Sequence, residues 1–143
     1  MKISTRGRYS LRMAVDLAQH YNDGFIALKD VSARQDISKK YLEQIIPFLI
    51  RSGILATNRG HMGGYKLAKP PAEITVKDVI VSAEGSLAPV SCMEGEVNDC
   101  PRRAQCLTLP IYTGLYKVID EYLSSITLQD IIDKGTTADD YCI

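Results

Sequence analysis

Three of the four cysteines in this 143-residue sequence lie close together, at Cys92, Cys100 and Cys106. Seven residues separate the first two and five separate the last two, which differs from the CxxC pairs of common zinc sites. Three thiolates on one loop can still converge on a metal centre, and iron–sulfur clusters are held chiefly by cysteine thiolates. Arg102 and Arg103 would lower the thiol pKa values and offset the charge of an anionic cluster. Three unconnected buried cysteines are the alternative interpretation.

The three cysteines fall in a segment, 86–107, that has no helical or strand periodicity and contains two prolines and a glycine. Loops of this length are usually functional or disordered. No stretch is apolar enough for a membrane span or a signal peptide, so we expect a cytoplasmic protein with no membrane association. In that reducing compartment clustered cysteines indicate metal binding or redox chemistry rather than disulfides. Cys142 lies near the C-terminal end, and we expect it outside the cluster.

The net charge of zero conceals an uneven distribution. Residues 1–69 contain 12 Lys and Arg against 5 Asp and Glu, a balance of +7, whereas residues 70–143 contain 5 against 12, a balance of −7. A basic region favours a polyanionic partner, and an acidic region favours a different task; ordinary charge scatter is the alternative. Pro70-Pro71 marks the expected boundary between the two regions.

The first region has the pattern of three helices followed by a β-hairpin. Thr5 is the expected cap of the first helix, the second covers about 28–34, and Ser38 caps a third that runs to about residue 52. The apolar stripe of the third helix occupies positions i, i+3, i+4 and i+7, at Leu42, Ile45, Ile46 and Leu49. Strands are expected at 54–57 and 65–68, joined by a turn whose three glycines supply positive φ angles. The fold class is therefore mainly α with a small β-hairpin, a winged helix-turn-helix.

The outward face of the third helix carries side chains that suit DNA. A helix-turn-helix places the N-terminal residues of this helix in the major groove. Gln44 can bond to an adenine edge, and Glu43 can accept from the cytosine amino group. Lys39 and Lys40 can neutralise phosphates, and Ser38 can donate to one. An ordinary solvated helix face is the alternative.

The hairpin turn strengthens the DNA-binding interpretation. Arg59 lies beside Gly60, where the backbone can approach closely, and an arginine there suits the narrow minor groove of A·T-rich DNA. Arg6 and Arg8, in the first turn of the first helix, are placed to contact phosphate. His61 is expected to be a surface turn residue rather than a ligand.

The second region, 70–143, contains the cysteine loop between helices. Thr75 caps a helix that ends near Gly85, and Pro110 starts a long helix over about 110–125. A capping box at Thr127–Asp130 opens a last short helix. The long helix carries an apolar stripe at Ile111, Leu115, Val118, Ile119 and Tyr122.

Five segments carry a resemblance to a known family: KISTRGRYSLRMAVDLA, ISKKYLEQII, LIRSGIL, NRGHMGGYKLA and CPRRAQCLTLP. In this order and spacing they resemble the IscR-type winged-helix regulators of the Rrf superfamily, which include iron–sulfur, nitric-oxide and cysteine-metabolism sensors. The resemblance implies a DNA-binding domain at 1–69 and, within 70–143, a cluster-binding loop, a dimerisation helix at 110–125 and a C-terminal tail. It also implies a homodimer on a two-fold-symmetric double-stranded DNA operator. The cluster would be 2Fe–2S, or alternatively 4Fe–4S, on the three loop cysteines.

The sequence departs from that family pattern at two points. Iron–sulfur regulators of this type carry a histidine three residues after the third cysteine, where this chain has Leu109. The spacing between the first two cysteines also exceeds the usual five. Candidates for a fourth ligand are Glu94, Glu96, Asp99, a residue of a partner subunit or an exogenous thiol. The cysteine-metabolism branch lacks this cysteine loop, which argues against membership there.

Three functions remain to be compared. The leading hypothesis is a cluster-dependent regulator of iron–sulfur biogenesis genes. A thiol-redox or nitric-oxide responsive regulator on the same scaffold is the alternative. A cysteine-nucleophile enzyme is disfavoured, because no histidine lies near any cysteine in the expected layout; we expect no enzymatic activity.

Overall fold

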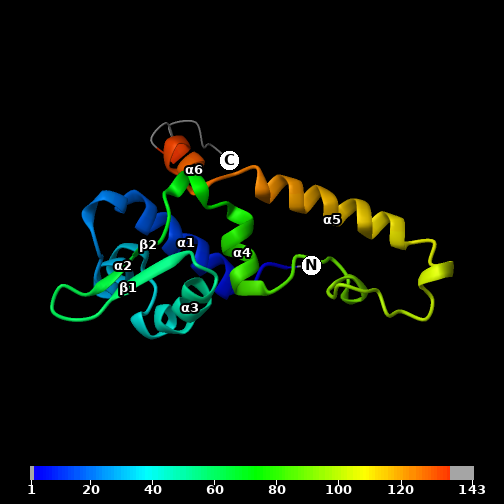
Figure 1. Cartoon of the computed structure of the whole chain (residues 1–143), viewed down its shortest axis with the longest axis horizontal. Coiled ribbons are helices and arrows are strands. Elements are labelled where there is room, and N and C mark those ends of the chain that lie inside the picture. The colour runs from blue at the N-terminus through cyan, green and yellow to red at the C-terminus, as the bar shows by residue number, and fades with distance from the viewer. Residues whose placement is uncertain (1, 136–143) are drawn as a thin grey trace.

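The computed structural model describes residues 2–135, which form six α-helices and one two-stranded antiparallel hairpin (Figure 1). This confirms the expected mainly α winged helix-turn-helix. In chain order the elements are α1 (Thr5–Gln19), α2 (Leu28–Gln35), α3 (Lys39–Arg51), β1 (Leu55–Asn58), β2 (Gly64–Leu67), α4 (Val76–Glu84), α5 (Leu109–Ser124) and α6 (Leu128–Gly135).

Helix starts follow the hydroxyl side chains of the sequence, with one correction. Ser38, Thr75 and Thr127 cap α3, α4 and α6 as expected, and the last two form reciprocal capping boxes with Asp78 and Asp130. The expected cap of α1 was wrong: Thr5 is the first helical residue and Ser4 is the cap.

Ser4 links the start of α1 to the end of α4. Its hydroxyl accepts a hydrogen bond from the Gly7 N–H at 3.1 Å, while its own N–H and hydroxyl donate to the Glu84 carboxylate at 2.9 and 2.5 Å. Two adjacent hydroxyl residues compete for the cap position, and only Ser4 gains the distant carboxylate. The cap is therefore decided by a contact 80 residues away in the sequence.

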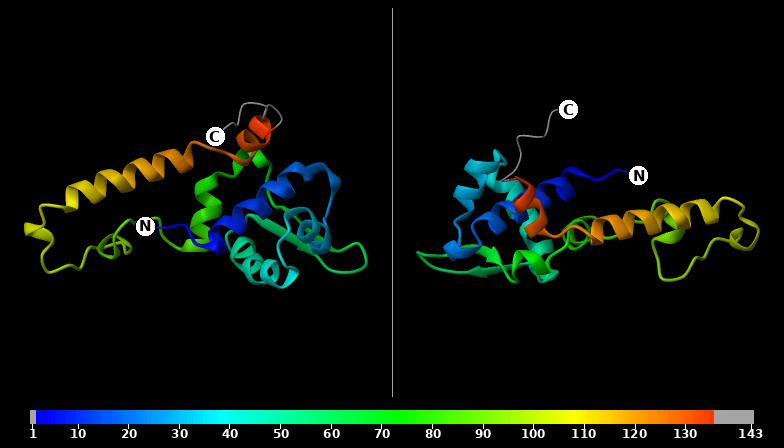
Figure 2. Two further views of the ribbon diagram at one scale, coloured as in Figure 1. Left: turned by 180° about the vertical axis from the view of Figure 1, so that it is seen from behind. Right: turned by 90° about the horizontal axis from the view of Figure 1, so that it is seen from above.

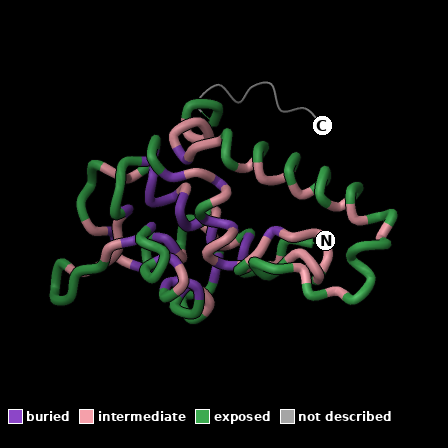
Figure 3. The backbone as a smooth tube through the Cα atoms, turned by 45° about the vertical axis from the view of Figure 1, so that its right-hand side comes forward, coloured by how far each residue is buried: buried purple, intermediate pink, exposed green. Residues whose placement is uncertain are grey.

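Most buried residues gather in one part of the molecule (Figure 3), and the hydrophobic core there packs around α1. The predicted stripe of α3 is fully buried, as are Met13 and Leu17 of α1 and Val31 of α2. Residues from beyond Pro70 complete the same core: Ile74 and Leu128 are both 0% exposed, and the Leu128 N–H donates to the Ile74 carbonyl at 2.9 Å. We call the unit made by α1–α4, the hairpin and α6 the head.

The hairpin pairs Leu55 with Leu67 and Asn58 with Gly64, one residue away from the expected strands. Only Gly60 of the three turn glycines has a positive φ, +117°, so the expectation was wrong for Gly63 and Gly64. Those two are needed for close approach instead. A Cβ on Gly63 would lie 2.6 Å from the Asn58 carbonyl oxygen, and one on Gly64 would collide with the backbone of Ile26.

The loop 86–107 and α5 project together from the head, and we call them the arm (Figures 1 and 2). The loop contains two short 3₁₀ turns, Ser91–Met93 and Arg103–Gln105, and α5 begins at Leu109 with Pro110 in its first turn. At the base of the arm, Tyr116, Ile119 and Leu123 pack against a small cluster of Val76, Ile80 and Leu87. The Lys77–Asp120 ion pair, at 2.5 Å, joins α4 to α5 there.

A buried carboxylate fixes α2 against α1. Asp16 is 1% exposed and accepts two hydrogen bonds from Arg34, at 2.7 and 3.0 Å, and one from Gln35 at 2.9 Å. Burial alone would raise the pKa of Asp16, but these hydrogen bonds and the charge of Arg34 outweigh it, so the pKa lies below its usual value. The end of α2 next to the turn of the helix-turn-helix is therefore held by an ionic contact.

We expect Asp16→Asn to lower the free energy of unfolding by about 1–3 kcal/mol at pH 7, because hydrogen bonds to a charged group are lost. The folded pKa is depressed, so this stabilisation is present above the unfolded pKa of about 3.9 and is lost as the pH falls through the folded pKa. Urea unfolding between pH 3 and 7 measures it. Asp30→Asn, at an exposed position of the neighbouring helix α2, is the control. Equal effects of the two substitutions at pH 7, or an Asp16→Asn effect that does not shrink as the pH falls below the unfolded pKa, would contradict the assignment.

Candidate nucleic-acid interface and cysteine loop

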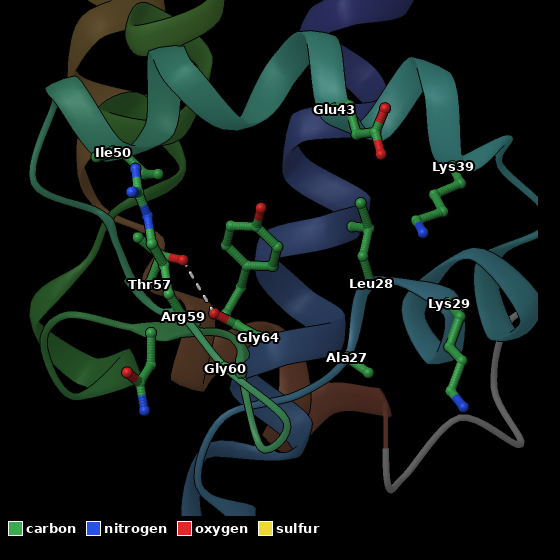
Figure 4. A pocket seen from close by; sticks show the side chains of 13 residues that line it. Ala27, Leu28, Lys29, Lys39, Glu43, Ile50, Thr57, Arg59, Gly60 and Gly64 are labelled. Carbon is green, nitrogen blue, oxygen red and sulfur yellow. Dashed lines mark hydrogen bonds between the residues drawn. The ribbon is translucent and has the colours of Figure 1, made fainter.

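A cleft of about 580 Å³ lies between α3 and the hairpin (Figure 4). Lys29 from α2, Lys39 from α3 and Arg59 from the hairpin turn bring three cations to its walls, and Glu43 is its acidic residue. Figure 4 shows Lys29 and Lys39 near one end of α3 and Arg59 near the other. A concave surface with this excess of positive charge suits a polyanion.

The exposed side of α3 follows from its buried stripe. Because the stripe faces the core, Lys39, Lys40, Glu43 and Gln44 all point away from it and are exposed. None of these four side chains makes a hydrogen bond or ion pair with another residue in 2–135. Donors and acceptors without partners on a helix face are available to base edges and phosphates.

Ser38 has a structural task besides the expected one. Its hydroxyl oxygen accepts from the Tyr41 N–H at 3.1 Å, which caps α3. The hydroxyl hydrogen of Ser38 stays available, because accepting this bond uses only a lone pair. Capping and phosphate donation are therefore compatible at this residue.

The hairpin, or wing, is held firmly at its base and is exposed at its tip. Ile26 and Tyr65 exchange two backbone hydrogen bonds, each 2.8 Å long, which join the wing to the segment before α2. Beyond this bridge Arg59, Gly60, His61 and Met62 are all exposed, and Met62 reaches 87% exposure. The wing thus presents Arg59 from a fixed platform.

The two arginines of the first α1 turn are arranged differently from one another. Arg6 lies over the Phe48 ring of α3, with 4.7 Å between the guanidinium carbon and the ring centroid. Arg8 donates to the Thr5 hydroxyl at 3.0 Å. Both are exposed, and neither lines the cleft. The structure therefore places the nine predicted DNA contacts in two groups: one around the cleft and α3, the other at the start of α1.

Sequence reasoning missed Lys29 in the cleft. The signal was available, because Lys29 is in the first turn of the first helix of the helix-turn-helix, next to the wing in this fold. It also missed Phe48 and Arg51, whose relation to Arg6 depends on a contact between α1 and α3 that no local pattern shows.

The three loop cysteines are free thiols and half-buried. Cys92 and Cys100 line one hollow together with Asp99, and Cys100 and Cys106 line a second hollow. Within residues 2–135 no three His, Cys, Asp or Glu side chains are close enough together to hold a metal ion. The cysteines predicted as ligands are thus near neighbours, with Cys100 between the other two, rather than gathered at one point. Cys142 lies outside the described residues.

Cys106 has a distinct electrostatic environment. Its sulfur lies 3.4 Å from the Thr108 hydroxyl oxygen, and this hydrogen bond is the main cause of a lowered thiol pKa. The backbone N–H groups of Thr108 and Leu109 and the charge of Arg102 act in the same direction. Arg103, by contrast, donates to the Asn98 carbonyl at 2.6 Å and fixes the loop.

The candidate fourth ligands differ in position. Glu94, Glu96 and Asp99 are exposed, and Asp99 lines the hollow of Cys92 and Cys100. Leu109, half-buried at the start of α5, offers no donor atom for a metal.

In residues 2–135 no helix is both long and apolar enough to cross a membrane.

Comparison with known proteins places the chain. The family model of Rrf2, described as an iron-dependent transcriptional regulator, matches residues 3–134. The rrf2 protein of Nitratidesulfovibrio vulgaris is 41% identical over 132 residues, 92% of this chain and 87% of that protein. IscR of T. potens superposes with a TM-score of 0.78 at 35% identity, over 100% of this chain and 94% of the other. CymR, the global cysteine regulator of B. subtilis, gives 0.73 at 33% identity, over 94% and 98%.

Both solved structures match nearly the whole chain with similar TM-scores, so the fold is common to an IscR and a CymR. The family match spans the cleft, the wing and the cysteine loop together. The chain belongs to the Rrf2 family and is a DNA-binding transcriptional regulator of the winged-helix type.

Proposed function

We propose that this protein is a homodimeric regulator of iron–sulfur biogenesis genes that binds a two-fold-symmetric DNA operator and senses through an iron–sulfur cluster. The observation that carries the proposal is the pairing of two features in one fold. A cationic cleft lies between α3 and the wing, and three free cysteines lie on an arm that begins where α4 leaves the head. One unit can bind DNA while the other binds the signal.

On DNA, α3 enters the major groove from its N-terminal end. Glu43 and Gln44 contact base edges, and Ser38, Lys39 and Lys40 contact phosphates. All five are exposed, as these roles require.

Two further groups complete the proposed contact surface. The wing carries Arg59 and Gly60 to the adjacent minor groove. Arg6 and Arg8 contribute phosphate contacts from α1.

Dimer formation is supported by an unsatisfied apolar face on α5. Ile111, Leu115, Val118 and Tyr122 recur at i, i+4, i+7 and i+11, so they lie on one side of the helix. Their exposed fractions are 69%, 41%, 63% and 64%. A second copy that pairs its own α5 with this face would bury the stripe of both chains at once.

Cluster binding is supported by the donor set. Three thiolates favour iron–sulfur over harder ions, and the nearby cations Arg102 and Arg103 would offset the negative charge of the cluster. Because the cysteines line two adjoining hollows with Cys100 in common, binding at one point requires the loop to contract around Cys100. Asp99 is the acidic side chain already beside two of the cysteines.

A thiol-redox or nitric-oxide response is the second candidate, and the Cys106 environment favours it. A thiol with a lowered pKa is present more often as thiolate, which is the reactive form. Cys106 also lies just before the first turn of α5, outside the core. A reaction at the Cys106 thiol would alter the arm directly, with no metal bound.

We expect Glu43→Ala to relax base preference, with about 1–3 kcal/mol of discrimination lost and little change on random DNA, because an acceptor for a base edge is removed.

We expect Arg59→Ala to weaken binding several-fold, most on operators with A·T-rich flanks. Anisotropy titrations use an operator selected in vitro by the wild-type protein, its single-base variants and random DNA. Glu73→Ala removes an exposed carboxylate outside the cleft as the control. Equal losses on selected and random DNA for Glu43→Ala would refute its assigned role.

We expect the anaerobically purified protein to be brown, with bound iron and sulfide. Simultaneous replacement of Cys92, Cys100 and Cys106 by serine should abolish both without changing the unfolding midpoint, because none of the three belongs to the core. A wild-type protein that stays colourless after reconstitution with iron and sulfide would exclude the cluster. Thiol titration under peroxide, with and without iron, then tests the redox alternative.

We expect Val118→Glu to convert the dimer to a monomer at micromolar concentration, because a desolvated charge without a partner costs several kcal/mol at an interface. Sedimentation equilibrium measures the change. Lys117→Ala is the control, since the Lys117 side chain is 74% exposed and adjacent on α5 but outside the stripe. A wild-type protein that is monomeric at this concentration would count against the α5 interface.

A further inference from the structure

Two arginines from different helices share one aromatic ring. The guanidinium carbon of Arg6 lies 4.7 Å from the Phe48 ring centroid, and that of Arg51 lies 5.7 Å from it. Arg6 is in the first turn of α1, and Arg51 is the last residue of α3. Cation–π contacts of this length hold each guanidinium in place. The ring thereby keeps two positive charges near one another.

Nothing in the described chain neutralises these charges. Both arginines are exposed, and neither side chain has a hydrogen-bond or ion-pair partner in residues 2–135. The nearby carboxylate of Glu84 already accepts from Ser4. Two like charges held on one ring in the absence of an anion repel each other, so the binding of anions beside them is favoured.

The pair lies on the continuation of the exposed α3 face. Lys40, Gln44, Pro47 and Arg51 recur at i, i+4, i+7 and i+11, and all four are exposed. Eleven residues of helix span about 16 Å, which exceeds the major-groove width of about 12 Å. A helix whose N-terminal turn lies among the bases therefore carries its C-terminal end to the level of the sugar–phosphate backbone.

We propose that Arg6 and Arg51, positioned by Phe48, form a binding site for DNA backbone phosphates. Arginine suits this task, because its planar donors match phosphate oxygens. The proposal rests on the proposed placement of α3 in the major groove, and it adds Arg51 as a contact and Phe48 as a positioning residue. It also gives α1 a direct role at the interface, because Arg6 reaches the same ring as Arg51.

The test is the salt dependence of binding to the selected operator and to random DNA. Each lost phosphate contact lowers the slope of log Kobs against log salt by about 0.9. Arg6→Ala and Arg51→Ala should each reduce the slope by about this amount and weaken binding equally on both DNAs, roughly 3- to 10-fold. Arg51→Lys should keep the slope, because the charge is retained.

Phe48 is tested separately from charge. Phe48→Tyr, which keeps the ring, should bind like wild type, and Phe48→Leu, which keeps apolar volume without the ring, should bind more weakly. Lys134→Ala removes a cation on α6, on the far side of the head from α3 (Figure 1), and should leave the slope unchanged. Unfolding curves of every variant confirm that the head is intact.

The outcomes separate this inference from the proposed function. A wild-type protein without a salt-dependent complex would refute the proposed DNA binding itself. If wild type binds and Arg6→Ala and Arg51→Ala leave the slope unchanged, the phosphate site is refuted while the α3 interface stands. An equal slope change for Lys134→Ala would show a general charge effect and would also refute the site. A Phe48→Leu variant with wild-type affinity would refute the positioning role of the ring.

Discussion

The packing of α1 is the constraint on which the rest of the molecule depends. This helix contacts α2, α3 and β2 on the part of the head that carries the cleft, and α4 and α6 on the part from which the arm leaves. Met13, Ala14 and Leu17 are buried at the centre of these contacts. Because α1 packs against both sets of elements, a movement of α4 relative to α1 also moves α4 relative to α3. The fold thus offers a short mechanical path between the arm and the cleft beside α3.

The head could be predicted from the sequence because its signals are local. The stripe of α3 at helical spacing, the hydroxyl caps and the glycine-rich turn each specify an element within a few residues, and the structure follows them closely. The error at the start of α1 arose where two local choices were equivalent. Ser4 and Thr5 can both cap a helix, and the choice depends on Glu84 from the far end of α4.

The arrangement of the cysteines could not be predicted in the same way. Their loop has no periodicity, so spacing alone leaves their mutual positions open, and the two hollows around Cys100 appear only in three dimensions. The Arg6–Phe48–Arg51 contact could not be predicted from the sequence for a related reason. It joins α1 to α3 through side chains whose individual positions carry no distinctive pattern. The apolar residues of α5 were predictable, but their division between a packed and an exposed face depends on where α4 lies.

The contact between Ser4 and Glu84 also leaves no room at a neighbouring position. A Cβ at Gly7 would lie 2.9 Å from the Ile3 side chain and would collide with the Glu84 carboxylate. A larger residue at position 7 would therefore push the Glu84 side chain away from Ser4 and give up both hydrogen bonds. A change in the first turn of α1 is thereby felt at the end of α4, where the arm begins.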